Sequence, residues 1–142
     1  MPMFGSRLPK RVTVDPSCNG LSAAFNPQMQ DAALKLLRAS LDPSNPAGRA
    51  EWGQIIAQPI LGGSPWIGHP FSEEKTHEIS GDRIARERPS AIGNLLTGYW
   101  PQSILLHTHP NPNDPGAVSA GDRNLGMPVI AIDTKGRMTC AF

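Results

Sequence analysis

Prolines and glycines recur along almost the whole chain. The 14 glycines and 15 prolines make up about a fifth of it, where an average protein has about 12% and disordered low-complexity chains exceed roughly 25%. The length of 142 residues is the usual size of one domain. We therefore expect a single folded domain that is rich in loops.

Positive and negative charges are nearly balanced. There are 13 basic and 12 acidic residues, which leaves a net charge of +1, whereas nucleic-acid-binding domains usually carry a basic excess. No apolar run approaches the ~20 residues of a membrane span, and the first ten residues lack the apolar core of a signal peptide. We expect a soluble chain that is produced in the cytoplasm, with no nucleic-acid partner and no membrane span.

The two cysteines stand near opposite ends of the chain. Cys18 and Cys140 lack the C-x-x-C spacing of a zinc knuckle or a redox pair. Because intracellular disulfides are rare, the sequence favours two independent thiols.

An amphipathic helix is predicted from Pro27 to about Leu41. Asn26 can cap this helix, and proline loses nothing at the first helical position. Residues at helical spacing then share one side: Met29, Ala33, Leu36, Leu37 and Ser40. Residues 1–25 are expected to form an N-terminal segment that precedes the domain proper, residues 26–142.

Strands are predicted on both sides of a central segment that the sequence does not resolve. Residues 81–100 fit either a short helix or an inserted loop, and a second helix is predicted to begin at Ser119. The predicted extended segments are Arg11–Val14, Glu51–Gln58, a piece around Trp66–Ile79 joined to it across Gly62-Gly63, Ser103–Thr108, and a terminal hairpin of Val129–Ile132 with Arg137–Phe142.

Two histidines and an aspartate have the spacing of a metal site. Side chains of a strand alternate, so His107 and His109 should point to the same side, roughly 7 Å apart. Asp122 falls on the first turn of the helix expected at Ser119. It can supply an oxygen ligand there and leave the fourth tetrahedral position to water.

The order H-x-H-P followed by S-x-x-D resembles the signature of the JAMM metallopeptidases, also called the JAB or MPN family. That family also carries a glutamate on an early strand after a first helix, in a pattern close to E-x-x-G before aliphatic residues. Residues 51–56, Glu-Trp-Gly-Gln-Ile-Ile, are similar in letters and in position. The resemblance implies zinc bound by His107, His109 and Asp122, Glu51 as the general base, and Ser119 as a helper for the developing oxyanion.

The same resemblance implies a fold and an activity. The fold would be a single α/β domain with a mixed, cytidine-deaminase-like β-sheet flanked by helices. The activity would be zinc-dependent hydrolysis of a peptide or isopeptide bond by metal-activated water. One departure lies in the loop of nine residues, 110–118, between His109 and Ser119, where the family usually has seven. Because this loop would border the metal, its length bears on the substrate pocket.

A small domain of this kind, with a proline-rich start and a motif near its C-terminus, is similar to the toxin module of a bacterial effector. Such a module acts on a protein or peptide substrate, is delivered by a specialised secretion system and is neutralised by an immunity protein.

Each part of the pattern also has an ordinary structural interpretation. Ser119 and Asp122 could only cap a helix, the histidines could be one core and one surface residue, and Glu51 could be a solvated strand-edge residue. The joint order favours the functional interpretation. Two alternatives remain: a non-catalytic JAMM-like binding module, and a metal-dependent nuclease toxin, which would need a basic groove.

One geometric expectation follows for the fold. The strand that carries Glu51 should lie beside the strand that carries His107, with the Glu51 carboxylate no more than about 8 Å from the midpoint of the two imidazoles.

Overall fold

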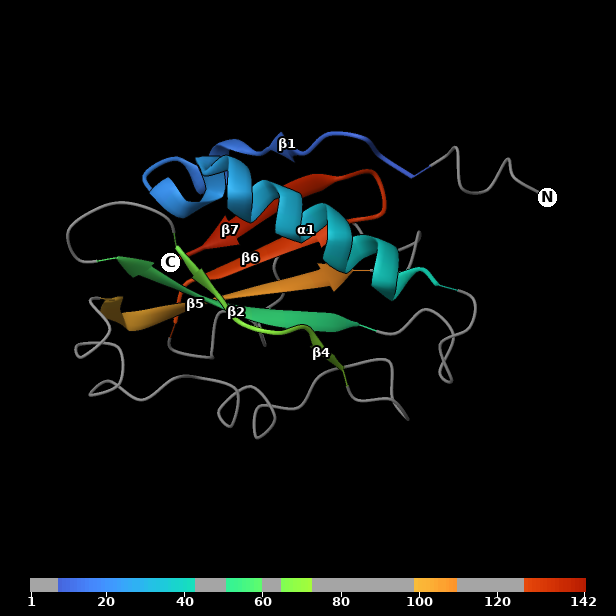
Figure 1. Cartoon of the computed structure of the whole chain (residues 1–142). Coiled ribbons are helices and arrows are strands. Elements are labelled where there is room, and N and C mark those ends of the chain that lie inside the picture. Colours follow the sequence, from blue (N-terminus) through green and yellow to red (C-terminus); the bar gives the residue numbers. More distant parts are fainter. Residues whose placement is uncertain (1–7, 43–50, 60–64, 73–98, 110–126) are drawn as a thin grey trace.

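A mixed β-sheet with one long helix on its face forms the framework of the protein (Figure 1). The computed structural model describes residues 8–42, 51–59, 65–72, 99–109 and 127–142. Within these ranges the sheet has seven strands in the order β1-β7-β6-β5-β2-β3, and β4 also pairs with β2. The strands are β1 (Thr13–Val14), β2 (Trp52–Pro59), β3 (Trp66–Ile67), β4 (Phe71–Ser72), β5 (Tyr99–His109), β6 (Val129–Asp133) and β7 (Arg137–Ala141).

Strand β5 lies near the middle of the sheet. It pairs antiparallel with β2 and parallel with β6, and β6 returns antiparallel as β7. The predicted terminal hairpin is therefore confirmed. Its turn needs glycine, because Gly136 has φ 81° and a Cβ there would lie 2.8 Å from Cβ of Pro9. A left-handed φ is strained for any residue with a Cβ.

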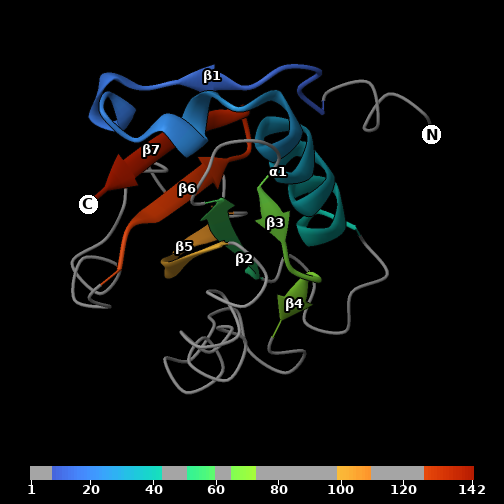
Figure 2. The ribbon, with the colours of Figure 1, turned by 60° about the vertical axis from the view of Figure 1, so that its left-hand side comes forward.

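The helix α1 (Pro27–Ser40) begins and ends as its sequence predicts. Asn26 Oδ1 accepts hydrogen bonds from the backbone N–H groups of Gln28 at 2.9 Å and Met29 at 3.1 Å. The side that faces the sheet is the predicted one, since Met29, Ala33, Leu36, Leu37 and Ser40 are all buried. Figures 1 and 2 show α1 along one face of the sheet.

Both faces of the sheet are buried. On the side of α1, the apolar cluster includes Ile56, Leu106, Ile130 and Met138 together with the helix. On the other side, a second cluster contains Ile55, Phe71, Leu105, Met127, Val129 and Ala131. Neighbouring residues such as Leu105 and Leu106 belong to opposite clusters, which is the alternation expected of strands. The predicted mixed α/β sheet is thus observed.

The N-terminal segment contributes to the same core. β1 pairs in parallel with β7, and the 3-10 turns η2 (Pro16–Cys18) and η3 (Ser22–Phe25) follow it. Cys18, Leu21, Ala23 and Ala24 are buried in the cluster on the side of α1. The described residues from β1 to η3 are therefore packed against the sheet rather than only leading into the domain.

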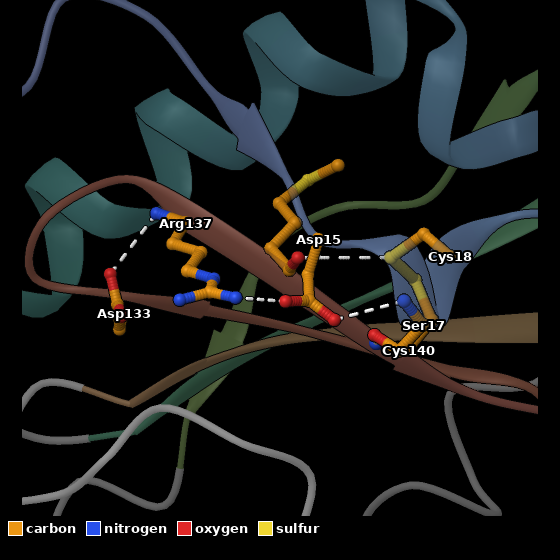
Figure 3. Close-up of polar contacts among 7 residues, drawn as sticks. Asp15, Ser17, Cys18, Asp133, Arg137 and Cys140 are labelled. Carbon is orange, nitrogen blue, oxygen red and sulfur yellow. Dashed lines mark hydrogen bonds and ion pairs between the residues drawn. A yellow bond between two sulfur atoms is a disulfide. The ribbon is translucent and has the colours of Figure 1, made fainter.

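Cys18 and Cys140 form a disulfide (Figure 3). The expectation of two independent thiols is therefore wrong. Because β1 runs beside β7, the turn η2 brings Cys18 against the end of β7, where the Cα atoms of the two cysteines are 4.9 Å apart. The backbone N–H of Cys140 also donates to Ser17 Oγ at 3.0 Å. The spacing of the two cysteines along the chain does not indicate that the fold brings Cys18 close to Cys140, so the disulfide could not be predicted from it.

Candidate functional site

His107 and His109 point to the face of the sheet opposite α1. They share that face with Leu105, while Leu106 and Thr108 face the helix. Both histidines are buried, with 1% and 6% exposure. The centroids of the two rings are 4.8 Å apart and the ring planes are inclined by 60°. Two imidazoles at this separation are close enough to bind one metal ion.

Glu51 lies immediately before β2, the strand that pairs with the histidine-bearing strand β5. Gly53 of β2 is opposite His107 of β5, which confirms the predicted neighbourhood of the two strands. Glu51 Oε1 is 3.1 Å from His107 Nδ1. Since the ring centroids of His107 and His109 are only 4.8 Å apart, the carboxylate oxygen meets the limit of about 8 Å from their midpoint.

The contact between Glu51 and His107 has a definite chemical consequence. A carboxylate at Nδ1 favours the tautomer that carries the proton on Nδ1, and the lone pair of a neutral imidazole then lies on Nε2. Metal-binding histidines commonly have a carboxylate or carbonyl at the nitrogen away from the metal, because it fixes the tautomer and orients the ring. The contact with Glu51 therefore leaves Nε2 of His107 as the nitrogen that could bind a metal ion.

The remaining predicted site residues lie outside the described residues. These are Ser119 and Asp122, together with the loop 110–118. Within the part of the chain that the structure describes, no group of three or more histidine, cysteine, aspartate or glutamate side chains is arranged to hold a metal ion. Of the five predicted site residues, the structure thus describes three: Glu51, His107 and His109.

Thr108 is a residue of this region to which sequence analysis gave no role. Its Oγ1 accepts a hydrogen bond from the backbone N–H of Trp52 at 2.9 Å and donates one to Ser40 Oγ at 2.8 Å. Strand alternation could have indicated its position, because it turns the middle residue of His-Thr-His away from the histidines and into the core. A hydroxyl in that position needs a hydrogen-bonding partner.

A cavity of about 460 Å³ lies between α1 and β3. Its lining includes Asp31 and Lys35 of the helix, Gln54 of β2 and Ile67 of β3. Gln54 is anchored there, because its Nε2 donates to the carbonyl oxygen of Gly68 at 2.7 Å. This cavity is on the helix side of the sheet, whereas the histidines are on the other side, so the two are separate.

Comparison with known proteins yields no relative for this chain: no protein-family model, no curated protein and no solved structure matches it. Among the described residues, no helix is both long and apolar enough to cross a bilayer. The arguments about function therefore start from the site itself.

Proposed function

We propose that this chain is a zinc-dependent hydrolase of the JAMM type, which cleaves peptide or isopeptide bonds with a metal-activated water. The observation that carries the proposal is the contact of 3.1 Å between Glu51 Oε1 and His107 Nδ1. It joins the glutamate that precedes β2 to the H-x-H motif of the neighbouring strand β5, on a buried face of the sheet. Glu51 and His107 are 56 positions apart in the sequence, so their contact depends on the fold and not on chain proximity.

The donor set fits zinc. Imidazole nitrogens and a carboxylate oxygen are usual zinc ligands, and three protein ligands leave a position open in catalytic sites. His107 and His109 would bind the ion, with Asp122 as the third ligand. When bound, zinc supplies two effects: it lowers the pKa of its water to about 7 and it polarises the scissile carbonyl.

The chain's own residues then have separate tasks. Glu51 accepts a proton from the attacking water and returns it to the leaving amine, as a general base and then a general acid. One oxygen of its carboxylate contacts His107, and the other is the candidate base. Ser119 would donate a hydrogen bond to the developing oxyanion. Burial of the histidines keeps competing water away from their ring faces.

The disulfide supports an extracytoplasmic place of action. Disulfides persist in oxidising compartments and are rare in the cytosol, and this one joins the two ends of the described fold. We propose a bacterial effector or toxin module, carried out of the producing cell by a specialised secretion system. Its substrate would be a protein or peptide, and an immunity protein would protect the producer.

The test is zinc binding together with hydrolysis. Purified wild type should bind about one zinc per chain, measured by mass spectrometry of the metal content, and His109→Ala should lose most of it. His69→Ala is the matched control, because His69 is an exposed histidine outside the site and its loss should leave the zinc content unchanged. A wild type that stays metal-free after zinc addition, or a His109→Ala protein as loaded as wild type, contradicts the proposal.

Substrate screening separates the alternatives. Wild type and Glu51→Gln are incubated with a peptide library, with ubiquitin-like isopeptide conjugates and with DNA and RNA. Cleavage of peptides that requires Glu51 supports the peptidase. Zinc binding with cleavage of nucleic acid instead supports the nuclease toxin, and zinc binding without any cleavage supports the binding module.

A further inference from the structure

The threonine between the two histidines connects three elements of the fold. Thr108 is completely buried on the side of α1. Its hydroxyl accepts from the Trp52 N–H at the start of β2 and donates to Ser40 Oγ at the end of α1. One side chain on β5 thereby holds both the strand that follows Glu51 and the helix behind the sheet.

The bond to Trp52 acts directly on the backbone of Glu51. The register of β2 against β5 begins with Gly53 opposite His107, and just beyond that pair the Thr108 hydroxyl binds the Trp52 N–H. Glu51 and Trp52 share a peptide bond. A contact that fixes the nitrogen of this bond therefore also fixes the backbone from which the Glu51 carboxylate reaches His107.

Ser40 fixes the direction of the Thr108 hydroxyl. Because the Thr108 proton is donated to Ser40 Oγ, an oxygen lone pair remains for the Trp52 N–H. Both side chains are at 0% exposure, so water cannot readily replace either of them. Hydrogen bonds in such buried surroundings hold their geometry closely, and losing one partner is costly.

We propose that Thr108, with Ser40 behind it, is a positioning residue for the candidate hydrolase site: its hydroxyl sets the placement of the Glu51 carboxylate relative to the H-x-H strand. This inference rests on the proposed zinc-dependent function. Neither hydroxyl reaches the face that carries the histidines, so the effect passes through Glu51 and through the strand itself. Loss of the Thr108 hydroxyl would make the position of the Glu51 carboxylate less fixed. The His107 ring would then be held less firmly in its orientation.

The chain offers a closely matched set of variants. Thr108→Val removes the hydroxyl while nearly keeping the shape, and Thr108→Ser keeps the hydroxyl. Ser40→Ala removes the hydroxyl to which Thr108 donates its hydrogen bond. Ser103→Ala is the control, because Ser103 is a buried residue of the same strand whose Oγ has no hydrogen-bond partner among the described residues.

Three quantities are measured on each variant. Thermal unfolding reports global stability, hydrogen exchange by NMR reports the protection of the Trp52 amide, and competition with a chelator reports the affinity for zinc alone. In Thr108→Val, Trp52 should exchange faster than in wild type while the Ile55 amide stays protected. Its zinc affinity should fall about 10- to 100-fold, the usual effect of disturbing the outer partners of metal ligands. Thr108→Ser and Ser103→Ala should stay within about threefold of wild type.

A purely structural role gives a different result. If Thr108→Val unfolds at a lower temperature but binds zinc as tightly as wild type, the hydroxyl only stabilises the fold and the positioning role is wrong. If Thr108→Val does not fold, Ser40→Ala decides, and a zinc affinity equal to that of Ser103→Ala overturns the proposal. If wild type itself binds no zinc, the proposed hydrolase function fails and the positioning role fails with it, which the wild-type measurement alone reveals.

Discussion

At the level of single residues, Glu51 is a largely buried, paired carboxylate rather than the solvated strand-edge charge that glutamate usually is. Its side chain is 18% exposed and that of its partner His107 is 2% exposed. Glutamate is mostly exposed in proteins, and burying a carboxylate is unfavourable unless it is hydrogen-bonded. The Nδ1–H of His107 offsets this cost, so the pair is expected to hold in the metal-free protein as well.

The first prediction concerns Glu51→Gln. The amide oxygen can still accept from His107 Nδ1, so fold and zinc content should stay close to those of wild type. The basic carboxylate is lost, and hydrolysis of the substrate found by screening should fall about 100-fold or more. Unfolding temperature, metal content and turnover measure the three outcomes. Turnover within about tenfold of wild type would remove Glu51 from the mechanism.

The second prediction concerns Asp15, which ties η2 to β7 (Figure 3). The pKa of Asp15 is lowered from 3.8 to about 2, first by the backbone N–H of Ser17, then by the Ser17 hydroxyl and by Arg137. A carboxylate with a lowered pKa in the folded state stabilises the fold above the ordinary pKa and loses this contribution as the pH falls. The stability that Asp15 provides should therefore disappear between about pH 4 and pH 2.

Thermal unfolding across this pH range provides the measurement. Wild type should unfold at a higher temperature than Asp15→Asn near neutral pH, and the difference should shrink steadily below about pH 4. Asn keeps the shape and one oxygen acceptor, so the comparison isolates the charge. A difference that does not change with pH would show that the carboxylate charge contributes nothing.

At the level of elements, α1 follows from local signals alone. Its cap, its first-turn proline and its periodicity all act within a few residues, so the sequence contains everything that determines its bounds. The third prediction tests the cap: Asn26→Ala should destabilise the protein by about 1 kcal/mol, because two backbone N–H groups lose their acceptor. Urea unfolding measures the loss. Asn26→Asp, which keeps an oxygen acceptor at a helix N-terminus, should unfold close to wild type.

Strands were predicted less completely than the helix, and prolines explain part of the difference. β5 begins at Tyr99 rather than at Ser103, and it therefore includes Pro101. β2 extends to Pro59, next to a shift in its register against β5. Proline lacks an N–H for the ladder and argues against a strand. Of the extended piece expected around Trp66–Ile79, the described part is observed as the short strands β3 and β4, both paired with β2, and residues 73–79 lie outside the described residues.

For the candidate site too, some features could be predicted from neighbouring residues, and others depend on contacts between distant parts of the chain. The shared face of His107 and His109 follows from strand alternation, which is local. The placement of Glu51 beside them follows from the pairing of β2 with β5, across 56 positions of sequence. Only the order of motifs in a resembling family pointed to that pairing. The role of Thr108 required the structure, because its partners Trp52 and Ser40 come from two other elements.

At the level of the whole molecule, the disulfide closes nearly the entire chain into one loop. Cys18 and Cys140 are separated by 122 positions, and the loop between them contains α1, the central strands and all five predicted site residues. A cross-link of this kind restricts the unfolded chain more than the folded one, and the restriction grows with loop length. Besides its apolar packing against the sheet, the segment from β1 to η2 is held by one short parallel pairing, by the hydrogen bond of Cys140 to Ser17 and by the ion pair of Asp15 with Arg137.

The fourth prediction follows from this closure. Reduction, or the double change Cys18→Ser and Cys140→Ser, should lower the free energy of unfolding by about 3–5 kcal/mol, as expected for a loop of roughly 100 residues or more. Urea unfolding with and without a reducing agent measures the loss in wild type. The double variant is the matched control, since a reducing agent should not change its unfolding further. Because Cys18 is fully buried, reduction of the native protein should be slow unless it is first partly unfolded. Two free thiols titrated in denatured protein that was purified under oxidising conditions would show that the pairing does not form.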